Sequence, residues 1–135
     1  MKIKGIEHIG IAVKSLKKDA PFWSHVLNIS PQGIEIVENE GVTTDIYNTG
    51  RGKVELLESL KDDSPVTKFI DKHGPGVHHI CFEVENIYDA IKELLESGID
   101  VIYKEPKKGA EGHLVTFIHP KSSGGVLVEL AQKQS

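Results

Sequence analysis

The amino-acid sequence predicts an α+β fold made of two copies of one βαβββ unit, because two different strings each occur twice. The string Gly-x-x-His-Ile around His8 recurs around His79, 71 residues later. The string Val-Glu-Leu around Glu55 recurs around Glu129, 74 residues later, which requires only a small loop insertion in the second copy. Such internal similarity is typical of an architecture built from repeated units.

The repeat divides the chain into three expected parts of a single domain. We expect repeat one at about 4–60, a linker helix at 64–74 and repeat two at about 76–132.

Repeat one begins with an alternating, Ile- and Val-rich segment at residues 4–13, which predicts a strand. A helix is expected over about 16–28. Pro21 is tolerated only in the first turn of a helix, so the helix is expected to start late, with Asp19 as a possible N-cap. Strands are expected at 34–38, 42–49 and 52–58, the last two joined by a tight glycine turn.

The linker and repeat two follow the same scheme. Ser64 and Pro65 predict an N-cap followed by proline at the first helical position, and Gly74 ends the helix. In repeat two we expect a strand, a helix from an Asn86 cap to Gly98, and three more strands; the strands are expected at 77–84, 99–104, 113–118 and 125–131.

The composition bounds the function. The chain has 135 residues, enough for one domain with a substantial core. Its net charge of -4 argues against nucleic acid as the main partner, because phosphate binding requires a basic surface. A single cysteine, Cys81, excludes an intrachain disulfide and favours the cytoplasm. We recognise no signal peptide and no apolar stretch of membrane-spanning length.

The strand faces point to a metal. Side chains alternate between the two faces of a strand, so His8 shares a face with Gly10, and His79 shares one with Cys81. The small neighbours leave room for a cavity, and Glu55 and Glu129 each interrupt an apolar run. A buried carboxylate without a partner is unfavourable.

His8, Glu55, His79 and Glu129 are therefore the candidate metal ligands. Two imidazole nitrogens and two carboxylate oxygens suit a divalent transition metal. Taken singly, a histidine or glutamate in a strand is usually a structural or solvated residue; the repetition of both is what favours a metal site.

These strings, with Gly76-Val77-His78-His79-Ile80, His119-Pro120-Lys121 and Gly125-Val126-Leu127-Val128-Glu129-Leu130, resemble the vicinal oxygen chelate superfamily and, within it, the methylmalonyl-CoA epimerases. The resemblance covers nearly the whole chain. It implies a glyoxalase-like, cup-shaped sheet, a Co, Mn, Ni or Zn ion, an acyl-CoA substrate, a homodimer, and interconversion of (R)- and (S)-methylmalonyl-CoA by proton transfer at C2.

The resemblance also implies catalytic roles. Epimerisation needs a base on one face of C2 and an acid on the other, and Glu129 is expected to serve as one of them. Several epimerases carry a second glutamate where this chain has Thr44. The neighbouring Asp45 is the candidate replacement, although a shift of one residue turns it to the other face unless a bulge intervenes. Glu55, a relayed water, or the absence of a second acid/base are the alternatives.

Two further residues are candidates for substrate binding. Lys121 and Ser122 lie in the polar turn after His119, where Lys121 is expected to contact a carboxylate or a CoA phosphate. A solvated loop is the alternative for this turn.

Two other functions fit the same ligand set. A glyoxalase I-type reaction is the runner-up, although Arg51 is the only arginine available to hold glutathione carboxylates. A non-catalytic binding protein on the same fold is the third hypothesis.

Overall fold

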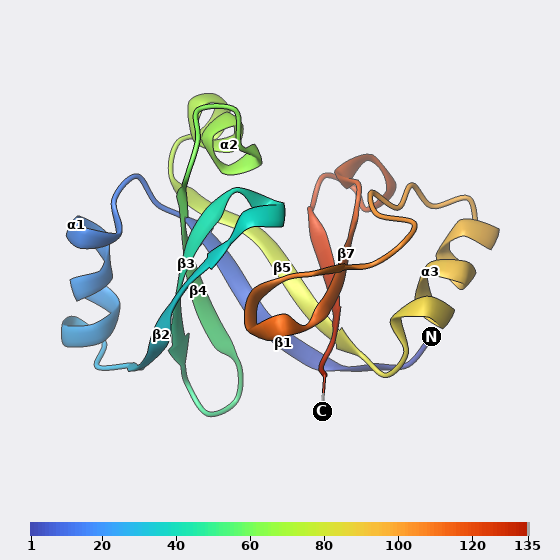
Figure 1. Ribbon diagram of the computed structural model, residues 1–135, viewed down its shortest axis with the longest axis horizontal. Helices are drawn as coiled ribbons and strands as arrows, with labels where there is room; N and C mark the ends of the chain where they lie inside the picture. Colours follow the sequence, from blue (N-terminus) through green and yellow to red (C-terminus); the bar gives the residue numbers. More distant parts are fainter. Residues whose placement is uncertain (135) are drawn as a thin grey trace. The chain divides into compact units, whose positions relative to one another are not determined.

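The computed structural model describes residues 1–134, which group into two compact units (Figure 1). Unit 1 comprises Met1–Glu7 and the chain from His79 onward, and unit 2 comprises His8–His78. The first strand, β1 (Ile3–Ala12), therefore begins in unit 1 and continues into unit 2. The predicted limits of the two repeats and the single-domain organisation stay predictions.

Unit 2 is a sheet segment with the strand order β2-β3-β4-β1. Strand β4 runs parallel to β1, whereas β3 runs antiparallel to both β2 and β4. Its elements after β1 are α1 (Leu16–Pro21), η1 (Phe22–Val26), β2 (Ser30–Val37), η2 (Glu38–Glu40), β3 (Val42–Asn48), β4 (Lys53–Ser59) and α2 (Pro65–His73).

Unit 1 repeats this arrangement with the strand order β5-β8-β7-β6. Strand β8 runs parallel to β5, and β7 runs antiparallel to β8 and β6. Its elements are β5 (Gly76–Val84), whose first residues belong to unit 2, α3 (Ile87–Glu96), β6 (Lys107–Lys108), η3 (Ala110–Gly112), β7 (Leu114–Ile118), η4 (Pro120–Ser122) and β8 (Val128–Gln132).

In each unit a helix covers one face of the sheet segment. In unit 2, Leu16, Ala20 and Trp23 pack on the apolar side chains of β1, β3 and β4. In unit 1, α3 packs through Ile87 and Ile91 on the corresponding face of β5 and β8. The helices thus bury the bulky face of each sheet segment, and the face with the histidines points away from them.

Most predicted caps are confirmed. The Ser64 side chain accepts a hydrogen bond from the backbone N–H of Thr67 at the start of α2, and Gly74 follows its last residue. Asn86 caps α3 by accepting from the N–H of Asp89.

The start of the first helix was predicted wrongly. Ser15, and not Asp19, is the N-cap, because its hydroxyl accepts the N–H of Lys18 and its backbone is extended. Pro21 stands at the end of α1. Proline has no N–H to continue the ladder, and the chain widens there into the π-helical turn η1.

The strand predicted at 99–104 is also wrong. Of this stretch only Val101 makes a β-bridge, to Ile118. Backbone hydrogen bonds flank this bridge, from the N–H of Ile102 to the carbonyl of Phe117 and from the N–H of His119 to the carbonyl of Asp100. Beyond it, the N–H of Asp100 donates to the Ser122 hydroxyl and that of Tyr103 to the Thr116 hydroxyl, so side chains end the pairing on both sides. The short strand β6 pairs with β7 instead.

Candidate metal centre

His8 and Glu55 form a buried pair in unit 2. Glu55 in β4 is the register partner of Gly10 in β1, and His8 lies two residues before Gly10 on the same face. His8 Nδ1 lies 3.1 Å from Glu55 Oε2. The parallel pairing of β1 and β4 therefore brings together two residues that are far apart in the chain.

His79 and Glu129 form the equivalent pair in unit 1. Glu129 in β8 is the register partner of Cys81 in β5, and His79 lies two residues before Cys81. His79 Nε2 lies 3.0 Å from Glu129 Oε1. Each unit thus holds one histidine and one glutamate in the same strand relationship.

A small residue makes room for each pair. Gly10 has no side chain, and Cys81 is completely buried against Val115 and Ala131. Cys81 is thus a small, buried side chain on the ligand face of its strand.

The chemistry of the two pairs fits a divalent cation. None of the four side chains is more than 5% exposed. Two buried carboxylates are costly unless a cation compensates them. His8, Glu55, His79 and Glu129 each belong to a group of buried histidine and glutamate side chains of the kind that could hold a metal ion. The residues that the sequence nominated as ligands are thus buried with the donor atoms a transition metal prefers.

Comparison with known proteins identifies the family. The model of the Glyoxalase/Bleomycin resistance protein/Dioxygenase superfamily matches residues 7–117. The chain belongs to this superfamily.

Two curated relatives carry the comparison further. Mitochondrial methylmalonyl-CoA epimerase of Homo sapiens is 41% identical over 94% of this chain and 73% of its own length. The ethylmalonyl-CoA/methylmalonyl-CoA epimerase of Cereibacter sphaeroides is 39% identical over 94% of this chain and 96% of its own.

A solved structure agrees with these relatives. A variant of Streptomyces coelicolor methylmalonyl-CoA epimerase, in complex with 2-nitronate-propionyl-CoA, has a TM-score of 0.93 and is 32% identical. The match covers 99% of this chain and 100% of that one. The predicted glyoxalase-like fold class of this superfamily is therefore confirmed.

Asp45 lies on the face opposite Glu55. Strands β3 and β4 pair without a bulge from Val42 to Asn48, and this register sets Asp45 beside Leu56 and Ile46 beside Glu55. The buried Asp45 carboxylate accepts a hydrogen bond from the Tyr47 hydroxyl at 2.6 Å. A catalytic role for Asp45 stays a prediction, and this placement weighs against it.

The buried contact with Asp45 helps to raise the pKa of Tyr47. Burial raises the pKa of Tyr47 to about 12, and the hydrogen bond and negative charge of Asp45 add to the effect, while a hydrogen bond with Ser24 opposes it. The phenol is therefore a hydrogen-bond donor at any physiological pH.

Lys121 and Ser122 lie together in η4. Lys121 Nζ pairs with Asp100 at 3.0 Å, with both side chains well exposed. The Ser122 hydroxyl accepts the N–H of Asp100 at 3.0 Å. Asp100 thus contacts the turn through two residues, Lys121 and Ser122. An exposed ion pair such as Lys121–Asp100 is weak enough for a ligand to displace.

The sequence analysis overlooked the aromatic residues beside His79. Phe117, the register partner of Glu129, lies edge-on to the His79 ring at 5.8 Å, and Tyr103 lies edge-on to Phe117 at 5.9 Å. Lys107 Nζ stands 4.3 Å above the Tyr103 ring. Phe117 could have been placed near the site from the sequence, because it lies on the ligand face of the strand antiparallel to β8. Tyr103 lies outside any strand, so no periodicity indicated its position.

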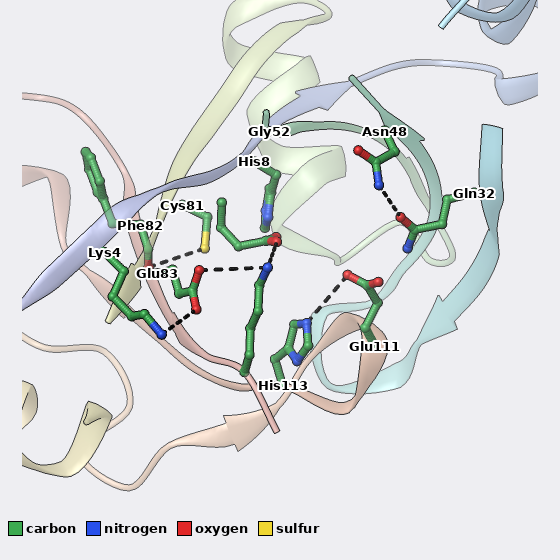
Figure 2. A network of polar contacts seen from close by, with 12 residues as sticks. Lys4, His8, Gln32, Asn48, Gly52, Cys81, Phe82, Glu83, Glu111 and His113 are labelled. Carbon is green, nitrogen blue, oxygen red and sulfur yellow. Dashed lines mark hydrogen bonds and ion pairs between the residues drawn. The ribbon is translucent and has the colours of Figure 1, made fainter. Parts of the chain in front are cut away.

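A network of charged groups in unit 1 was also overlooked. Figure 2 shows Lys4 reaching Glu83, at 3.6 Å. Lys133 Nζ lies 3.8 Å from Glu83 and 3.3 Å from the buried carboxylate of Glu7. Glu7 directly precedes His8, and its burial with a lysine partner could not be inferred from alternation along β1.

Proposed function

We propose that this protein is a metal-dependent epimerase that interconverts (R)- and (S)-methylmalonyl-CoA by proton transfer at C2. The observation that carries the proposal is the pair of equivalent, buried His–Glu contacts. They occur in a chain about 40% identical to curated methylmalonyl-CoA epimerases over most of its length.

We propose His8, Glu55, His79 and Glu129 as the ligands of a divalent ion, with Co, Mn, Ni and Zn as the candidates. The charges of Glu55 and Glu129 would balance a 2+ ion, which favours a dication over a monovalent one. Such an ion supplies Lewis-acid stabilisation of the negative charge that develops on the substrate oxygens when the C2 proton leaves.

Glu129 is proposed as a proton carrier as well as a ligand. Its carboxylate is buried, and the Phe117 ring lies beside its partner His79, so water is largely excluded from this carboxylate. A carboxylate shielded in this way can take up the C2 proton on one face of the substrate, while a second group delivers a proton to the other face.

The second proton carrier has to act on the face of C2 opposite Glu129. Thr44, on the same strand face as Ile46 and hence as Glu55, has no titratable group. Asp45 lies on the other face, where its carboxylate accepts a hydrogen bond from the Tyr47 hydroxyl. Glu55, which lies on the ligand face with its carboxylate against His8, is therefore favoured over Asp45 for this role.

Lys121 and Ser122 are proposed to bind the acyl-CoA. The Lys121 ammonium would exchange its surface partner Asp100 for the carboxylate of the substrate. The Ser122 hydroxyl already accepts the N–H of Asp100, so it would hold the turn in place and donate its own proton to the substrate.

The other hypotheses of function are less well supported. The relatives compared above are epimerases, which favours epimerisation over a glyoxalase I-type reaction and over non-catalytic binding. Among residues 1–134, none of the helices has the length and apolarity to cross a membrane. A homodimer and a cytoplasmic location are part of the proposal.

Deuterium exchange tests the proposed reaction. The protein, stripped of metal and then loaded separately with each candidate ion, is incubated with (2S)-methylmalonyl-CoA in deuterated water. We expect metal-dependent incorporation of deuterium at C2 together with appearance of the R form. Absence of exchange in every metal-loaded sample, with the fold intact by circular dichroism, would overturn the proposal.

A further inference from the structure

A surface groove in unit 2 is not used by the reaction proposed above. It has a volume of about 690 Å³ and lies where β1 ends and the chain turns into α1. The end of β1, the turn to α1, the first residues of η1 and the residues Pro75–Gly76 line it. The groove therefore has walls from two parts of the same compact unit.

Two lysines that form no ion pair within the described part of the chain line this groove. Lys14 and Lys18 are exposed, and neither has a carboxylate within ion-pair distance among residues 1–134. Some other exposed lysines are paired, as Lys121 is with Asp100 and Lys2 with Glu85. In a chain with a net charge of -4, two free cations beside one groove form a local site for an anion.

The groove also has an aromatic wall. The Phe22 ring is 50% exposed and lies edge-on to Trp23, with ring centroids 5.3 Å apart. Trp23 is held in place because it also packs on the core of unit 2. A half-exposed ring on a rigid support offers a flat apolar surface for another ring.

We propose that this groove binds the nucleotide end of coenzyme A. Its adenine ring would pack on Phe22, and its phosphates would lie against Lys14 and Lys18. Asp19, which also lines the groove, would accept a hydrogen bond from the ribose hydroxyl. This proposal rests on the proposed function, since it assigns the remote part of the same substrate.

The position along β1 is compatible with one substrate reaching both places. Ile11, the first groove residue, follows His8 by three positions, which is about 10 Å along a strand, and its side chain lies on the opposite face, so the substrate would pass around the end of β1. The pantetheine arm of coenzyme A is an extended, flexible chain that exceeds this length. It can therefore connect a thioester near His8 to a nucleotide beyond the end of β1.

Binding is tested without catalysis, because Trp23 is the only tryptophan of the chain. Adenosine 3′,5′-bisphosphate is titrated while tryptophan fluorescence is recorded. We expect a saturable change that weakens with salt and is absent with adenosine. The variants Lys14→Gln and Lys18→Gln should each weaken binding about fivefold. Lys17→Gln removes a neighbouring exposed lysine that does not line the groove, and should leave binding unchanged.

Kinetics distinguish this proposal from the proposed function. With methylmalonyl-CoA, Lys14→Gln and Lys18→Gln should raise KM about fivefold and leave kcat unchanged. With methylmalonyl-pantetheine, which lacks the nucleotide, the same variants should match the parent. Exchange at C2 with an unaltered KM for methylmalonyl-CoA in both variants would overturn the groove assignment and leave the epimerase proposal standing. Nucleotide binding detected at Trp23 without any exchange at C2 would support the groove assignment and overturn the epimerase proposal.

Discussion

The imidazole of His79 lies 3.0 Å from the carboxylate of Glu129, although 50 residues separate the two in the chain. The parallel pairing of β5 and β8 produces this contact, because it sets Glu129 opposite Cys81, two residues after the histidine. His8 and Glu55 stand in the same relationship through β1 and β4. The two repeats thus form the same His–Glu contact from different pairs of strands.

Glu129 and Glu55 should respond differently to the same substitution. Glu129→Gln removes the proposed proton carrier, and we expect C2 exchange to fall by roughly 10²- to 10⁴-fold. Glu55→Gln keeps an oxygen ligand but loses the carboxylate favoured as the second proton carrier. It should therefore retain the metal and the C2 exchange that Glu129 supports, and lose interconversion of the R and S forms. Deuterium exchange and interconversion, with metal content measured for each variant, check both. Comparable loss of exchange in the two variants at full metal occupancy would contradict the separate role of Glu129 and favour a shared one.

Metal binding should stabilise the fold, because the ligands come from strands that unfolding separates. At a free metal concentration about 100 times Kd, the expected gain is about 2.7 kcal/mol, which raises Tm by roughly 5–10 °C. Differential scanning calorimetry of the chelator-treated and metal-loaded protein measures the shift. His79→Ala should lose it. His25→Ala, at a histidine in η1 outside the ligand set, should keep the full shift; an equal loss there would argue against the assigned ligands.

Tyr47 should control stability at high pH. Its pKa is about 12 in the fold against an ordinary value of 10.0 for tyrosine, so the fold favours the neutral phenol. The resulting stabilisation is present in full below about pH 10 and is lost as the pH rises from 10 to 12. Tyrosinate absorbance should show a late titration step that disappears in Tyr47→Phe and persists in Tyr88→Phe.

The same variant should also destabilise the protein at neutral pH. Tyr47→Phe leaves the buried Asp45 carboxylate without its 2.6 Å donor, at a cost of about 1–3 kcal/mol. Chemical denaturation measures this difference. A Tyr47→Phe protein as stable as the parent would show that water or another group replaces the phenol. Unchanged activity in that variant would agree with the placement of Asp45 away from the ligand face.

Lys121 should affect substrate binding and leave the fold unchanged. Its exposed pair with Asp100 contributes at most about 1 kcal/mol to stability, so Lys121→Ala should melt close to the parent. If Lys121 binds the substrate carboxylate, KM for methylmalonyl-CoA should rise several-fold. Lys92→Ala, on the exposed side of α3, is the matched control. Equal KM values for the two variants would remove Lys121 from the substrate site.

The sequence alone determined the repeat, the caps at Ser64 and Asn86, and the four ligand candidates. These features are local or periodic: alternation places His8 and Gly10 on one face of a strand, and a carboxylate within an apolar run is conspicuous at Glu55 and Glu129. The family resemblance then supplied the reaction class. Each of these inferences needs only neighbours along the chain or a comparison of one segment with another.

Only the tertiary structure decided the remaining features, because they depend on which strands pair and in what register. The bulge-free pairing of β3 with β4 turned Asp45 to the Tyr47 side. Hydroxyl partners from Thr116 and Ser122 limit the strand expected at 99–104 to a single β-bridge at Val101. The burial of Glu7 beside Lys133, and the positions of Phe117 and Tyr103 near His79, arise from contacts between segments far apart in the sequence. Periodicity specifies which face a residue takes, whereas packing determines what it meets there.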